Sequence, residues 1–253
     1  MSQGPLLLAI ESATPAAAGV ALMRGEMAIA SRALSSARPA SETLLPAVVA
    51  LLEEAGVALA AIDAFAVSVG PGSFTGLRVG VATVKGLAFG GEALVVAVPT
   101  LAALALRAAP APGPIAALLD ARRGEVYAAL YDGDPGLPPR VGPSVLRPEA
   151  LAEVLATLAA ETPCTVIGEG IAVVVDALHA RFGNALRLVP PPDGRPDAVA
   201  VGRLGARLLA AGAGIAAETL TPVYVRRAEA EVQRTGERFE ALCTRFDTPG
   251  NLS

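Results

Sequence analysis

Residues 68–80 read SVGPGSFTGLRVG and place four glycines and a proline between a β-like run and a helix-like run. The β-like run covers 65–69, and apolar residues recur at helical spacing from about 76 to 89. Strand, glycine-rich turn and helix is the order in which many proteins hold phosphate groups. The stretch therefore predicts an α/β fold and raises the question of whether its turn binds a nucleotide.

The stretch matches neither of the two common phosphate-binding loops. A P-loop needs G-x-x-x-x-G-K-[ST], but Gly70 and Gly76 are one residue too far apart and Leu77 stands in place of the lysine. A dinucleotide-binding loop needs an acidic residue at the end of the next strand, and 98–100 (VPT) supplies none.

Two interpretations of the turn stay open. It could hold an anion weakly on backbone amides near the helix N-terminus, at Gly70, Gly72, Ser73, Thr75 and Gly76. The alternative is a capped turn in which Ser73 or Thr75 is the N-cap of the helix. Taken alone, the capped turn is the commoner structure.

The helix after the turn has little polar surface. At 100° per residue its apolar residues form one face: Leu77, Val81, Val84 and Ala88. Its small residues form a second face: Gly76, Gly80, Thr83, Gly86 and Gly90. A surface helix normally buries one stripe and solvates the rest, so we expect this helix to be covered twice. Its own sheet would cover one side, and either a neighbouring helix or a partner protein the other.

Composition limits the classes of function. The 253 residues suffice for one large or two small domains, and with 53% hydrophobic but 4% aromatic residues the core must be built from Ala, Val and Leu. The net charge of −4 argues against a global basic field for nucleic acid. Cys164 and Cys243 belong to no metal-binding motif and fit a reducing compartment. Without an apolar run of membrane-spanning length, a cytoplasmic protein is expected.

The order of elements predicts two α/β halves. Strands are expected at 6–11, 17–23, 27–34, 64–69 and 93–98, and helices at 42–55, 76–89 and 100–109. The turn 24–26 (RGE) predicts a hairpin. Ser41 and Gly56 are expected to cap the helix 42–55, and Pro46 predicts an irregular first turn.

A proline-rich run at 109–114 predicts a domain boundary, after which the second half also opens with a hairpin, at 115–120 and 125–131. A loop (132–143), helices (148–160, 171–182 and 196–211) and strands (165–168 and 222–226) are expected to follow. The predicted domains are therefore 1–109 and 110–228, with a flexible charged tail over 229–253.

Catalytic groups are scarce in the sequence. His179 is the sole histidine, which excludes a metal site with two histidines. No G-x-S-x-G motif occurs, and neither cysteine has a base beside it. The carboxylates at strand ends and turns are more often caps than catalytic groups: Glu11, Asp63, Asp120 and Glu125.

The glycine segment GPGSFTGLRVG at 70–80, with KGLA at 85–88, resembles the signature of the TsaB (YeaZ) family. Three further stretches are similar to that family: LAIESATP at 8–15, LDARRGEVY at 119–127 and PVYVR at 222–226. The resemblance covers most of the chain in the family's order. It implies two actin/Hsp70-like (ribonuclease H-like, βββαβα) domains, the second smaller and more irregular.

The resemblance also implies a role in making threonylcarbamoyladenosine, the tRNA modification next to the anticodon. Members of the family are non-catalytic partners of the transferase TsaD, and the ATP-hydrolysing TsaE is a third component. A metal ion and a nucleotide would then belong to the complex through TsaD, and no cofactor is expected in this chain. The chain would meet tRNA only through the complex.

In the family, TsaD or a second copy of the chain binds the two helices of the first domain, here 42–55 and 76–89. This assigns the partner interface to eleven positions: Leu45, Val48, Val49, Leu52, Gly76, Arg78, Val79, Gly80, Val81, Thr83 and Val84. Ala40 stands where family members often have histidine.

Two alternatives are an actin-like nucleotide-binding enzyme and a glycoprotease-like peptidase. The turn 11–14 (ESAT) lacks the aspartate and glycine of an actin-like phosphate loop, and 121–124 (ARRG) is bulky. Direct tRNA binding by the chain alone is disfavoured by its net charge, although Arg226 and Arg227 could contribute to a composite surface.

Overall fold

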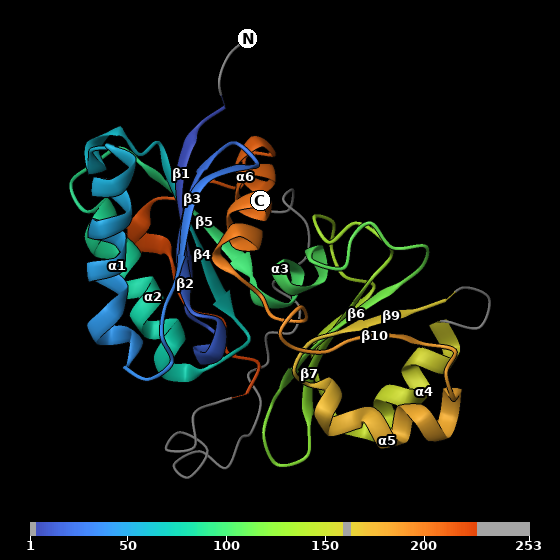
Figure 1. The fold of residues 1–253 in the computed structure, drawn as a ribbon. Coiled ribbons are helices and arrows are strands. Elements are labelled where there is room, and N and C mark those ends of the chain that lie inside the picture. The colour runs from blue at the N-terminus through green and yellow to red at the C-terminus, as the bar shows by residue number, and fades with distance from the viewer. Residues whose placement is uncertain (1–3, 159–162, 227–253) are drawn as a thin grey trace. The chain divides into compact units, whose positions relative to one another are not determined.

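The computed structural model describes residues 4–158 and 163–226, which form two compact units (Figure 1). Unit 1 contains 4–103 and 196–223, and unit 2 contains 104–158, 163–195 and 224–226. The expected domains, 1–109 and 110–228, differ from this division because 196–223 return to unit 1. The expected tail, 229–253, lies outside the described residues, as do Arg227 and Cys243.

Unit 1 is a five-stranded sheet with helices on both faces. Its strands are β1 (Leu6–Glu11), β2 (Gly19–Arg24), β3 (Met27–Ala33), β4 (Ala64–Gly70) and β5 (Leu94–Pro99), in the spatial order β3-β2-β1-β4-β5. The β1–β2 and β2–β3 pairs are antiparallel, and the β1–β4 and β4–β5 pairs are parallel. Figure 1 shows α1 (Ala40–Ala55) and α2 (Phe74–Ala88) on one face of this sheet and α6 (Ala198–Ala210) on the other.

The remaining elements of this part of the chain are short. They are α3 (Thr100–Leu106) and the 3-10 helices η1 (Pro15–Ala17), η2 (Leu59–Ala61) and η3 (Ala217–Thr219). None of the helices within 4–158 and 163–226 has the length and apolar character needed to cross a membrane.

Helix α6 belongs to unit 1 because two of its glycines let it lie close to the sheet. A Cβ on Gly202 would come 2.5 Å from Met23 Cγ, and one on Gly205 would come 2.5 Å from Ala66 Cβ. Any larger side chain would push the helix away from β1, β2 and β4, against which it packs. The spacing of residues did not predict that α6 packs in unit 1, because its glycines fit against strands that lie far away in the chain.

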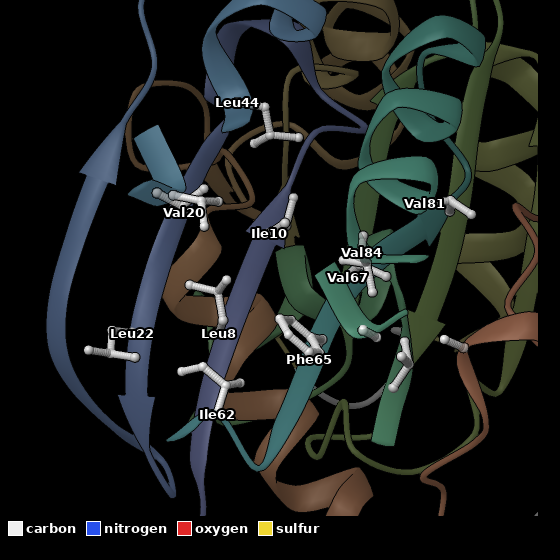
Figure 2. Packing of buried hydrophobic residues seen from close by; sticks show 14 of the residues in the cluster. Leu8, Ile10, Val20, Leu22, Leu44, Ile62, Phe65, Val67, Val81 and Val84 are labelled. Atoms are coloured by element: carbon white, nitrogen blue, oxygen red, sulfur yellow. The ribbon is translucent and has the colours of Figure 1, made fainter. Parts of the chain in front are cut away.

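The core of unit 1 lies between the sheet and helices α1 and α2. Figure 2 shows side chains from the strands and from both helices meeting there: Leu8, Ile10, Val20, Leu22, Leu44, Phe65, Val67, Val81 and Val84. The predicted apolar face of α2 is confirmed, because all four of its residues are buried. Each buried valine or leucine contributes roughly 1.5–3 kcal/mol relative to an exposed side chain.

Unit 2 repeats the strand order of unit 1. Its strands are β6 (Ile115–Asp120), β7 (Val126–Tyr131), β8 (Val141–Leu146), β9 (Thr165–Ile167) and β10 (Arg187–Val189), in the spatial order β10-β9-β6-β7-β8. The β6–β7 and β7–β8 pairs are antiparallel, and β6–β9 and β9–β10 are parallel. Helices α4 (Pro148–Leu158) and α5 (Ile171–Phe182) pack against each other (Figure 1). The expected duplicated α/β fold of the actin/Hsp70-like, ribonuclease H-like class is confirmed.

Several local predictions were wrong. The expected loop 132–143 ends in strand β8, which contains Pro143; the edge of a sheet tolerates proline because no further strand needs its N–H. Helix α1 starts at Ala40 with Pro39 rather than Ser41 as N-cap, and it continues through Pro46 without a break. The segment 222–226 forms no strand, although Val223 N–H donates to the Val69 carbonyl at 2.7 Å.

Candidate functional site

The glycine turn joins β4 to α2 and is a capped turn. Ser73 is the N-cap of α2, and its Oγ accepts a hydrogen bond from Gly76 N–H at 3.3 Å. The Ser73 N–H donates to the Ala13 carbonyl at 2.7 Å, and the Gly70 N–H donates to Thr100 Oγ1 at 3.1 Å. Amides of the expected anion site at Gly70, Ser73 and Gly76 are therefore used within the chain.

The glycines of the turn serve close packing. A Cβ on Gly72 would lie 2.6 Å from the Ala13 carbonyl oxygen, and one on Gly76 would overlap the Ser12 carbonyl oxygen. Gly70 has a φ of 128°, which side chains disfavour, and a Cβ there would overlap the Val223 carbonyl oxygen. The chain's own backbone thus fills the space that a phosphate-binding turn leaves open.

The small face predicted for α2 divides into a buried part and an open part. The Ser12 hydroxyl donates to the Gly76 carbonyl at 2.9 Å, and a Cβ on Gly80 would overlap that hydroxyl. Gly76 and Gly80 are therefore covered by the loop after β1 and not by a partner. A Cβ on Gly86 would meet no atom within 4 Å, so this part of the face is open.

Glu11 ends β1 as a fully buried carboxyl group. Its Oε1 accepts a hydrogen bond from Thr14 N–H at 2.9 Å, whereas Oε2 has no hydrogen-bond partner among the described residues. Burial raises the pKa of Glu11 from 4.5 to about 7, and nearby Asp197 raises it further. Hydrogen bonds from Thr14 and Ser68 oppose this rise in pKa without outweighing it. The carboxyl group closes the loop that holds α2.

Six of the eleven predicted interface residues are buried within unit 1. They are Val48, Leu52, Gly76, Gly80, Val81 and Val84. Their burial leaves them little surface to offer a partner. The other five reach the surface: Leu45, Val49, Arg78, Val79 and Thr83. Leu45 is 51% exposed and Val49 is 48% exposed, although both are apolar.

Three surface residues of the same region were missed. Ala82 and Gly86 are exposed, and Phe89, which follows the last turn of α2, is 85% exposed. They follow Arg78 at spacings of four, four and three residues, which places them on one stripe of the helix. The signal was present, since Gly86 belongs to the small face noted in the sequence.

We define the outer face of α1 and α2 as these surface residues together: Leu45, Val49, Arg78, Val79, Ala82, Thr83, Gly86 and Phe89. The two helices contact each other and lie side by side in Figure 1. The Arg78 guanidinium lies 3.9 Å from the centre of the Phe74 ring, an arrangement that holds the one charged member of the face against α2.

The carboxylates at the strand ends act as caps and ion-pair partners. Asp63 Oδ2 accepts from Leu6 N–H at 2.7 Å, and Asp120 Oδ1 accepts from Arg122 N–H at 2.7 Å. Glu125 pairs with Arg226, which also donates to the Ala121 carbonyl at 2.7 Å. The sequence interpretation of these residues as caps is confirmed for Asp63 and Asp120.

The other candidate groups are not brought together. His179 lies on α5 and lines a hollow of about 150 Å³ with Leu186 and Leu188. Cys164 is buried, and burial raises the pKa of its thiol to about 11. Within 4–158 and 163–226, no cluster of three or more His, Cys, Asp or Glu side chains has an arrangement that could hold a metal ion.

Comparison with known proteins gives concordant results. The family model described as "TsaD: tRNA N6-adenosine threonylcarbamoyltransferase" matches residues 33–233. The protein named tRNA threonylcarbamoyladenosine biosynthesis protein TsaB from Escherichia coli (strain K12) is 34% identical over 227 residues, covering 87% of this chain and 94% of that protein. The protein of the same name from Bacillus subtilis (strain 168) is 37% identical over 125 residues, covering 49% of this chain and 55% of that protein.

Among solved structures, the one described as "YeaZ from Pseudomonas aeruginosa" superimposes with a TM-score of 0.72 at 34% sequence identity. The match covers 87% of this chain and 99% of that chain. The similarity in sequence and the similarity in fold therefore extend over the same large share of the molecule.

Proposed function

Since the chain belongs to the TsaB (YeaZ) family of tRNA threonylcarbamoyladenosine biosynthesis proteins, we propose that it is a non-catalytic subunit that binds and activates TsaD. The observation that carries this proposal is the outer face of α1 and α2. In the proposed complex TsaD supplies the transferase site with its metal ion and nucleotide, and TsaE is a third component. The complex meets tRNA in the cytoplasm.

The outer face has the properties of a protein interface. Leu45 and Val49 on α1 and Phe89, which directly follows α2, are large apolar side chains that are about half exposed or more, and α1 and α2 pack together. Large apolar side chains exposed on neighbouring elements are typical of a docking site. Ala82 and Gly86 add exposed small residues on α2, which would allow a helix of the partner to approach closely.

The packing of the glycine turn supports a non-catalytic role. The turn after β4 packs closely against the loop after β1, because Gly72 lies against Ala13 and Gly76 lies against Ser12. In α/β sheets, ligands usually bind beyond the carboxyl ends of the strands. This end of unit 1 is instead occupied by backbone, so its evident use is to fix the position of α2.

Co-purification with TsaD tests the proposal directly. Val49→Glu and Ala82→Glu would each place a charge in the proposed interface and should lower recovery of TsaD at least tenfold. Ile29→Glu is the matched control, because Ile29 is 46% exposed, close to the 48% of Val49, but lies on the edge strand β3. The control should recover TsaD as the parent chain does.

A reconstituted assay of threonylcarbamoyl transfer to tRNA then tests activation. TsaD and TsaE should be active with the parent chain and with Ile29→Glu, and inactive with Val49→Glu. Full activity of TsaD and TsaE without this chain would overturn the proposal. So would equal recovery of TsaD by all three variants.

The same face is proposed to join two copies of the chain when TsaD is absent. The molar mass in solution, measured by light scattering over a range of concentrations, should show a dimer for the parent chain and a monomer for Val49→Glu. A dimer that persists in Val49→Glu would place the self-contact elsewhere.

A further inference from the structure

The turn between β6 and β7 has an unusual backbone. Arg122, Arg123 and Gly124 have φ values of 64°, 59° and 73°, so three consecutive residues are left-handed. Only glycine adopts this conformation without a steric penalty, and arginine is not among the residues that favour it. Two arginines are therefore held in an unfavourable conformation that projects their side chains from the end of a hairpin.

The surrounding structure holds this turn in place. Asp120 Oδ1 accepts a hydrogen bond from Arg122 N–H at 2.7 Å, and the Glu125 N–H donates to the Arg122 carbonyl at 3.2 Å. Arg226 donates to the Ala121 carbonyl and pairs with Glu125. The turn is thus braced from both strands and from a residue about a hundred positions away in the sequence.

The guanidinium groups of Arg122, Arg147 and Arg226 pair with carboxylates around the turn, and Arg123 is an exposed residue of the turn itself. We call these four residues the arginine cluster. The side chain of Arg122 is 86% exposed and that of Arg147 is 77% exposed. Their carboxylate partners are Asp120, 3.3 Å from Arg122, and Glu125, 3.8 Å from Arg147.

The cluster carries a positive excess on a chain whose net charge is −4. Of its four arginines, three pair with only two carboxylates, Asp120 and Glu125. Glu169 interacts electrostatically with Asp120, Arg122 and Arg195, so that Glu169 and Arg195 add one charge of each sign. A guanidinium has five N–H donors, so one that is paired with a carboxylate keeps donors for a phosphate.

We propose that the arginine cluster binds phosphates of the RNA backbone and is this chain's contact with tRNA in the complex. The inference deepens the proposed function, on which it rests for the presence of tRNA. Arginine suits this role because its planar group binds phosphate through paired hydrogen bonds. Tyr127, half-buried on β7, interacts with Arg226 and Asp120 and adds an aromatic ring of the kind that RNA-binding surfaces use.

The test uses an unmodified tRNA transcript and the complex of the full chain with TsaD. The double variant Arg122→Asn/Arg123→Asn removes two charges, and asparagine tolerates the left-handed conformation. Arg140→Asn is the matched control, because Arg140 is also an arginine of unit 2 paired with a carboxylate, Asp132, at 3.4 Å.

Each lost phosphate contact should lower the slope of log K against log salt by about 0.7–0.9, which corresponds to about a five- to eightfold loss of affinity at 0.1 M salt. Arg140→Asn should change neither quantity. Unchanged affinity and slope in the double variant would overturn the inference. Normal RNA binding with lost TsaD or TsaE binding would also overturn it, and would assign the cluster to an acidic protein surface.

The same measurement with the chain alone separates this inference from the proposed function. If no complex with TsaD forms, the proposed function fails. The arginine cluster is then tested by measuring, at low salt, the weak binding of the isolated chain to the transcript. Weaker binding by the double variant than by Arg140→Asn would support the cluster. Equal binding by the two variants, or none by the parent chain, would overturn it.

Discussion

Glu11→Gln should make unit 1 more stable at neutral and alkaline pH. Glu11 is fully buried, its Oε2 has no hydrogen-bond partner among the described residues, and burial raises its pKa from 4.5 to about 7. An ionised carboxylate in this position is unfavourable, whereas a protonated carboxyl or an amide is neutral. The substitution keeps the size of the side chain and an oxygen for the Thr14 N–H.

The sign and size of the effect follow from the two pKa values. Below pH 4.5 the carboxyl group is protonated in the folded and the unfolded chain, so its favourable contribution is complete. As the pH rises from 4.5 to 7, the unfolded chain ionises while folded Glu11 keeps its proton, and stability falls by about 1.4 kcal/mol per pH unit. The whole loss is about 3 kcal/mol, and Glu11→Gln should not show it.

Native-state hydrogen exchange of peptides from β1 and β4 is the suitable assay, because all three tyrosines belong to unit 2 and the chain has no tryptophan. The stability difference between Glu11→Gln and the parent chain should grow by about 3 kcal/mol from about pH 4.5 to about pH 8. Glu54→Gln, which removes an exposed carboxylate of unit 1, is the control and should show no such growth. A difference between Glu11→Gln and the parent that does not change with pH would refute the reasoning and show that folded Glu11 is already ionised.

Four further substitutions test helix α2 and the turns. Gly76→Ala should destabilise unit 1 by at least about 2 kcal/mol because its Cβ would overlap the Ser12 carbonyl oxygen, while Gly86→Ala should stabilise α2 by up to about 1 kcal/mol; equal effects in hydrogen exchange would contradict this. Ser73→Ala should cost about 1 kcal/mol through loss of the N-cap, seen as faster exchange in the first turn of α2. Arg123→Gly should stabilise unit 2 by about 1 kcal/mol in urea unfolding followed by tyrosine fluorescence, whereas no gain would mean that the left-handed turn is unstrained.

The elements whose signals are local could be predicted from the sequence. Alternating strands, the turn 24–26 and the helical spacing after Gly70 gave the order of elements in unit 1, and the apolar face of α2 followed from periodicity alone. Gly56 ends α1 with a φ of 64°, as its glycine predicts. These features depend on the conformational preferences of a few adjacent residues, which any sequence displays directly.

Features that depend on distant packing could not be predicted. The small residues of α2 showed that something approaches the helix, but not that Ser12 covers Gly76 and Gly80 while Gly86 stays open. The return of α6 to unit 1 likewise depends on Gly202 meeting Met23, some 180 residues earlier in the chain. Periodicity identifies a face of a helix but not what packs against it, which is why six residues predicted for the interface turn out to be buried in unit 1.

The similarity of the two units extends to the glycine at the carboxyl end of the fourth strand. Gly70, the last residue of β4, and Gly168, which follows β9, have the same φ of 128°. A Cβ on Gly168 would overlap the Leu118 carbonyl oxygen, as one on Gly70 would overlap that of Val223. In each unit the carboxyl end of the fourth strand is thus filled by the chain's own backbone. Ligands of α/β sheets usually bind at this end, and here backbone carbonyl groups approach it closely in both units. The two contact surfaces that we propose, the outer face of α1 and α2 in unit 1 and the arginine cluster in unit 2, consist mainly of exposed residues and include neither of these glycines.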